Sequence, residues 1–197
     1  MSNEIYNAPQ AELANENDQA NAKEFFIVST RKLWIMGLVT MGIYLIFWNY
    51  YHWRNYRQSI DDQSIWPVPR AIFSLFFIGS LMKLISEAFE NKTGEAWAYT
   101  KYVVIYIFVS LISWFTSLIG DDSQVFIIID VLFLIFGTIL FIYSVVPAQE
   151  KANKVCDDSA GLSNNKLTTA NIIWIIVFVL FWIVGLAGFY IGFTEGY

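Results

Sequence analysis

The sequence has little charge, a single cysteine and a single histidine. Of its 197 residues, 15% are charged, 56% are hydrophobic and 18% are aromatic, whereas about a quarter of the residues in soluble domains are charged. Cys156 alone cannot form an intramolecular disulfide framework or a multi-cysteine zinc or iron–sulfur site. His52 alone cannot supply a two-histidine metal or haem site, and we expect it to be an interfacial side chain. The sequence therefore predicts no metal and no cofactor.

The chain also lacks the short motifs of common enzyme classes. It contains no Walker-type glycine loop, no H-E-x-x-H and no G-x-S-x-G. Its net charge is −5, but the first twenty residues hold Glu4, Glu12, Glu16 and Asp18, and the charge elsewhere is nearly balanced. A nucleic-acid partner would need a continuous basic surface. We therefore expect neither an enzyme nor a nucleic-acid-binding protein.

Long apolar runs are the feature that the sequence has in abundance. An α-helix of about 20 apolar residues crosses a hydrocarbon core of about 30 Å. The runs predict an all-α, polytopic membrane helical bundle with about five membrane helices, at residues 33–53, 71–90, 99–120, 124–146 and 170–193. They form a single membrane domain over residues 25–197. Residues 1–24 are rich in Asn, Ala, Gln and Glu, and predict a disordered cytoplasmic tail.

The first two segments leave two topologies open. Segment 71–90 has only twelve uncharged residues before Lys83, which is short for a span. Basic residues favour the cytoplasmic side, which places the amino terminus in the cytoplasm and the carboxy terminus in the periplasm. If all five segments cross the membrane, the basic loop with Arg54, Arg57 and Arg70 lies on the periplasmic side, against this rule. Either segments 33–53 and 71–90 cross with that loop tolerated outside, or both are re-entrant or interfacial and return to the cytoplasm.

A few charged residues lie inside or beside the predicted spans. Asp130 lies about 9 Å from the Gln124 end of its helix. A carboxylate at that depth marks an ion path or proton relay, or is a structural group hydrogen-bonded to a neighbouring helix. Lys83 and Lys101 lie near membrane edges, where we expect them to snorkel, and Glu87 is a candidate partner for Lys83 one turn on.

Small residues recur on two of the predicted helices. Such residues let membrane helices approach closely and hydrogen-bond. The predicted packing faces consist of Ser110, Ser113 and Ser117 on one helix and of Gly185, Gly188 and Gly192 on the last. They predict association with a second copy of the chain or with another membrane protein, in addition to the lipid bilayer.

One stretch of the chain resembles a known family. The pattern comprises Val28-Ser29 before Lys32-Leu33, Met36, Thr40-x-Gly42-x-Tyr44, the aromatics from Trp48 to Trp53, Pro69-Arg70-Ala71-x-Phe73, and later Gln149, Asn153, Val155, Asn171, Trp182 and Gly185. In these residues the chain is similar to the uncharacterised bacterial membrane proteins grouped as the DUF4234 family. The resemblance implies a protein of the bacterial inner membrane and implies no activity.

These observations favour a non-enzymatic membrane interaction or accessory protein. A small transporter or channel-like component is an alternative, in which Asp130 and Lys83 or Lys101 line a polar path. A membrane enzyme acting on lipid is a second alternative. It would need polar groups clustered at one interface, and the loop with Arg54, Arg57 and Arg70 is the region that offers them.

Overall fold

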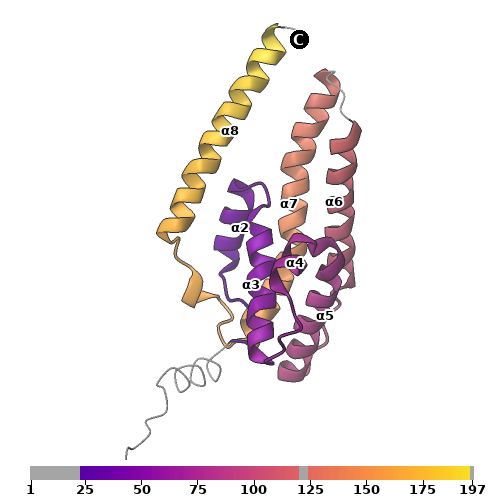
Figure 1. Cartoon of the computed structure of the whole chain (residues 1–197), viewed down its shortest axis with the longest axis vertical. Helices are drawn as coiled ribbons and strands as arrows, with labels where there is room; N and C mark the ends of the chain where they lie inside the picture. Colours follow the sequence, from indigo (N-terminus) through magenta and orange to yellow (C-terminus); the bar gives the residue numbers. More distant parts are fainter. Residues whose placement is uncertain (1–22, 120–123, 196–197) are drawn as a thin grey trace, which may run out of the picture.

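The computed structural model describes residues 23–119 and 124–195, and the predicted tail 1–24 therefore lies almost wholly outside the described residues. Within these ranges the secondary structure is helical, with no strand and with seven α-helices and one 3₁₀ helix. They are α2 (Thr30–Val39), α3 (Tyr44–Ser59), α4 (Pro67–Ile72), α5 (Ser74–Thr93), α6 (Thr100–Ile119), α7 (Gln124–Val155), η1 (Leu162–Asn164) and α8 (Thr169–Glu195). The predicted all-α class is confirmed for this part of the chain (Figure 1).

The first apolar run is not one helix. It is a hairpin in which α2 and α3 run in opposite directions (Figure 1). Met41 and Gly42 have left-handed backbone angles, with φ of 52° and 83°, which end a right-handed helix. The Thr40 hydroxyl donates to Met36 O at 2.7 Å and accepts from Tyr44 N at 2.9 Å, so that one side chain serves the end of α2 and the start of α3.

The second apolar run is also divided. Pro67 starts the short helix α4, where a missing N–H costs nothing. The chain then bends at Phe73, whose backbone angles are not helical, before α5 begins at Ser74. In Figure 1, α4 lies at mid-height and α5 descends from it toward the end of the molecule where α3 finishes. The predicted segment 71–90 therefore does not form one straight span.

The prediction of about five membrane helices is wrong on the criterion of length and apolar composition. In the described residues only two helices meet it, at Val131–Val155 in α7 and Thr169–Ile191 in α8. The apolar part of α6, Thr100–Phe115, is shorter. Hydropathy sums side chains over a window and does not register the turn at Thr40–Ile43 or the bend at Phe73, which explains the overcount.

The packed core lies at one end of the molecule, between α2, α3, α5 and α7. Its fully buried side chains include Leu33, Met36, Leu45, Trp48, Trp53, Ile78, Leu81, Met82, Ile85, Ile142, Val145, Ala148 and Ala152. The rest of α6, α7 and α8 exposes large apolar side chains along its length, and no residue in the most apolar window of α8 is buried. Exposed apolar surface of that extent marks a membrane or protein interaction site.

A buried amide network fixes the chain before α2 against α7. Gln149 Oε1 accepts from Trp48 Nε1 at 2.6 Å and lies 3.1 Å from His52 Nε2. Its Nε2 donates to Phe26 O at 2.9 Å and to Asn153 Oδ1 at 2.7 Å. Since buried polar groups cost free energy unless they are paired, this network specifies how α3 and the chain before α2 seat on α7.

Candidate functional site

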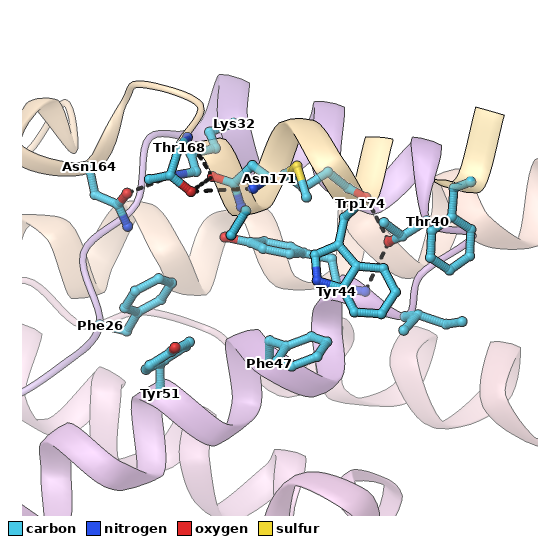
Figure 2. A pocket seen from close by; sticks show the side chains of 14 residues that line it. Phe26, Lys32, Thr40, Tyr44, Phe47, Tyr51, Asn164, Thr168, Asn171 and Trp174 are labelled. Carbon is cyan, nitrogen blue, oxygen red and sulfur yellow. Dashed lines mark hydrogen bonds between the residues drawn. The ribbon is translucent and has the colours of Figure 1, made fainter. Parts of the chain in front are cut away.

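A groove of about 290 Å³ lies between α2, α3 and the start of α8. Helix α8 stands apart from α6 and α7 and contacts α2 (Figure 1). The lining side chains are Phe26, Lys32, Met36, Thr40, Ile43, Tyr44, Phe47, Tyr51, Asn164, Thr168, Ala170, Asn171, Trp174 and Phe178. The helical hairpin provides one wall of the groove and α8 provides the other (Figure 2).

One end of the groove is polar. Lys32, Asn164, Thr168 and Asn171 gather there (Figure 2). The Asn171 carboxamide oxygen accepts from Thr168 N and from Thr168 Oγ1, both at 3.0 Å, and this local pair caps the start of α8. The first turn of α8 therefore presents polar groups to the groove.

The rest of the groove is aromatic and apolar. Phe47 and Trp174 face each other from α3 and α8, with ring centroids 6.3 Å apart. Phe26 stacks on Tyr51 at 5.0 Å. Phe47 and Trp174 are 43% and 44% exposed, whereas Met36 and Tyr44 deeper in the groove are 1% and 9% exposed. The groove is therefore open at the edge formed by Phe47 and Trp174.

Polarity changes along the groove in the direction of the helix axes. On α8 the lining proceeds from Asn171 to Trp174 and Phe178, which spans about 10 Å at helical rise. The lining residues of α2 follow the same order, with the charged Lys32 before the apolar Met36. One leaflet of a bilayer has the same order, with polar headgroups first and apolar chains beneath them. The groove therefore has the polarity that suits an amphipathic molecule.

Lys32 is the charged residue of the groove and is only 4% exposed. Its ammonium donates to Asn164 Oδ1 at 2.7 Å and to Lys166 O at 2.9 Å, and both acceptors are uncharged. The ion pairs found in the described residues, Lys83–Glu87 and Lys92–Asp157, do not include it. Burial lowers the pKa of Lys32, because desolvation disfavours its charged form.

The two described intramembrane polar candidates, Lys83 and Lys101, have separate neighbours. Lys83 is exposed and lies 3.6 Å from Glu87, which confirms the expected pair one turn on. Lys101 is exposed, with its ammonium 4.8 Å from the ring centroid of Tyr102. Asp130 falls in α7, but its side chain lies outside the described residues.

The three arginines of the predicted basic loop bind separate neighbours. Arg57 hydrogen-bonds Gln63, while Arg54 is exposed. Arg70 lies on α4, with its guanidinium carbon 4.4 Å from the ring centroid of Trp53 and 5.4 Å from that of Phe77. None of the three lines the groove.

Of the predicted packing residues that the structure describes, Ser113, Gly185 and Gly188 are exposed and Ser110 is half-buried. Ser110 donates to Tyr106 O in its own helix at 2.8 Å, and Ser113 is exposed. A side chain added at Gly185 or Gly188 would meet nothing within 4 Å. The side chain of Ser117 and the surroundings of Gly192 lie outside the described residues.

Sequence reasoning missed the groove and misplaced the histidine. Lys32 appeared only as a flank of the first apolar run, and its partner Asn164 is 132 residues away. The Thr40-x-Gly42 pattern is the local signal for the turn that creates one wall of the groove. His52, expected at an interface, is fully buried, with Trp48 at 4.3 Å between ring centroids.

Comparison with known proteins identifies no relative of this chain: no protein-family model, no curated protein and no solved structure matches it.

Proposed function

We propose that this protein is a non-enzymatic accessory protein of the bacterial inner membrane that holds an amphipathic lipid in the groove between the α2–α3 hairpin and α8. The proposal is based on the change in polarity along the groove. The lining is polar at Lys32, Thr168 and Asn171, and it is aromatic at Trp174 and Phe178. A lipid's chain would lie against the aromatic walls and its headgroup at the polar end. The proposed location in a bacterial membrane is based on the resemblance to the DUF4234 family.

We also propose that the hairpins α2–α3 and α4–α5 are re-entrant. The apex of the first exposes Leu38, Ile43 and Phe47, and the region around the second bend exposes Ile72 and Phe76. Apolar apices of this kind favour insertion into the hydrocarbon region, where the hairpin backbone is satisfied internally.

Re-entrance also removes the conflict with the charge rule. If α3 returns to the side on which α2 began, the loop after α3 is cytoplasmic, and Arg54 and Arg57 obey the rule. Residues 102–150 and 167–197 contain no Lys or Arg. The basic residues then all belong to segments on or near the cytoplasmic side. Helices α6, α7 and α8 then cross the membrane, which leaves the carboxy terminus in the periplasm.

The exposed faces at Ser113 and at Gly185 and Gly188 support association with a second copy or another membrane protein as part of the accessory role. The transporter alternative rests on Asp130 in the sequence alone, since its side chain lies outside the described residues.

Photo-crosslinking tests whether a lipid chain enters the groove. The full chain is reconstituted in nanodiscs with phosphatidylcholine that carries a diazirine in one acyl chain, and adducts are mapped by mass spectrometry. Met36 and Tyr44 line the groove and are nearly buried, whereas Phe136 is 61% exposed on α7 and reports surrounding lipid. We expect adducts at Met36 and Tyr44 as well as at Phe136.

Two matched alanine substitutions on α8 provide the control. Ala170 lines the groove, and Ala187 is exposed outside its lining. Ala170→Trp should fill the polar end and reduce the adducts at Met36 and Tyr44 without changing those at Phe136, whereas Ala187→Trp should change neither. Adducts confined to Phe136 in the unmodified chain, or an Ala170→Trp variant with unchanged groove adducts, would contradict lipid binding in the groove.

A further inference from the structure

A second cavity of about 600 Å³ lies beside the polar end of the groove and shares Lys32 with it. Arg31, Lys166 and the first residues of α2 also line this cavity. The two cavities together are lined by three basic residues and by no acidic residue. Such a one-sided charge distribution attracts an anion.

The ammonium of Lys32 retains capacity for a further ligand. An ammonium has three donors, and two of those of Lys32 go to Asn164 Oδ1 and Lys166 O. In the described part of the chain no carboxylate forms an ion pair with it. A buried charge without a counter-ion is costly, so an anion delivered to this point would recover free energy.

We propose that the groove selects an anionic phospholipid, whose phosphate-containing headgroup pairs with Lys32 while its acyl chain occupies the aromatic part of the groove. This inference rests on the proposed function, because it names the class of lipid that the groove holds. Arg31 and Lys166 strengthen the positive field at the headgroup end, and Lys32 provides the direct contact. Charge complementarity is the reason for an anionic headgroup in place of a zwitterionic one.

The test compares two photoactivatable lipids that share one acyl chain and differ in headgroup, phosphatidylglycerol and phosphatidylcholine. Each is reconstituted with the full chain at the same low mole fraction in a phosphatidylcholine nanodisc, and the adduct yield at Met36 is divided by the yield at Phe136. Both headgroups carry the phosphate that can accept from Lys32, but phosphatidylcholine adds a choline cation, which the three basic residues of the lining repel. Repulsion between unit charges near a protein surface lowers affinity by about ten-fold. We therefore expect the normalised yield at Met36 to be about ten-fold higher with phosphatidylglycerol.

Two lysine variants locate the source of the preference. Lys32→Met keeps much of the side-chain length and removes the charge, and it should bring the two lipids to equal yields at Met36. Lys101→Met removes an exposed lysine that lines neither cavity, and it should leave the preference intact. The comparison of headgroups in the unmodified chain needs no variant and stands even if Lys32→Met fails to fold.

The outcomes separate the two proposals. Equal yields of both lipids at Met36 in the unmodified chain would overturn the anionic selection and leave lipid binding in the groove intact. A preference that survives Lys32→Met in a folded variant would also overturn it, by removing Lys32 as the recognising group. An absence of adducts at Met36 with either lipid would overturn the proposed function itself.

Discussion

Gln149→Met tests the amide network that seats the groove wall on α7. Methionine nearly matches the volume of glutamine but removes both polar atoms of the amide. In the native protein Oε1 accepts from Trp48 Nε1 and pairs with His52 Nε2, and Nε2 donates to Phe26 O and Asn153 Oδ1. Because Oε1 can only accept, His52 carries its proton on Nε2.

The magnitude follows from the groups that lose their partner. Trp48 and His52 are fully buried, so that neither ring N–H can turn to water, and Phe26 O loses the amide that donates to it. Each buried polar group left without a partner costs about 1–3 kcal/mol. Asn153 Oδ1 also loses a donor, but it still accepts from Val28 N at 3.4 Å. Three such groups give an expected loss of about 3–9 kcal/mol in the free energy of unfolding.

Equilibrium unfolding in mixed micelles, followed by far-UV circular dichroism, measures this loss. Gln58→Met on the exposed side of α3 is the matched control and should change the free energy of unfolding by less than about 0.5 kcal/mol. If Gln149→Met were as stable as the control, the network would not hold α3 and the chain before α2 on α7. The groove wall would then need another support.

Three further predictions concern single positions. Gly161 has φ of 64°, and an added Cβ would lie 2.6 Å from Ser29 N, so Gly161→Ala should cost at least about 2 kcal/mol in the same unfolding assay. Burial lowers the pKa of His52 from 6.5 to about 3, so the unfolded chain binds the proton first and stability should fall by about 2 kcal/mol from pH 7 to pH 5. Trp182 Nε1 donates to Val39 O at 3.1 Å, so Trp182→Phe should speed hydrogen exchange at the carboxyl end of α2 and widen the spread of spin-label distances between α2 and α8.

Each of these predictions has a result that would contradict it. An unchanged unfolding free energy in Gly161→Ala would mean that the loop does not approach Ser29 closely. A free energy of unfolding that does not change between pH 7 and pH 5 would mean that water reaches His52 in the folded state. His52→Gln is the control, and it should abolish the fall in stability between these two pH values. An unaltered distance distribution in Trp182→Phe would show that other contacts fix α8.

The two longest helices could be predicted from the sequence, whereas the hairpins could not. Segments 124–146 and 170–193 lie inside α7 and α8. Each is one continuous apolar run that no turn interrupts, so a hydropathy average is enough to find it. In segment 33–53 the break depends on the left-handed angles of Met41 and Gly42 and on the Thr40 hydroxyl. These are local backbone features, and a window average of hydropathy does not contain them.

The candidate site was still less accessible to sequence reasoning. Lys32 looks like an ordinary flank of a membrane segment until Asn164 and Lys166 bury it from the far end of the chain. The resemblance pattern did include Lys32, Tyr44, Gln149 and Asn171, which line the groove or hold its wall. It carried no information about which of them meet, since that depends on contacts between α2, α3, α7 and α8.

In the proposed topology the α2–α3 hairpin enters the membrane and returns on the cytoplasmic side, so that the groove faces one leaflet beside α8. Alkaline phosphatase inserted after Asp62, in the loop between α3 and α4, reports the side of the membrane on which this loop lies. We expect no phosphatase activity there and full activity for a fusion after Tyr197. Activity at Asp62 equal to that at Tyr197 would place the loop in the periplasm and exclude a re-entrant α2–α3 hairpin.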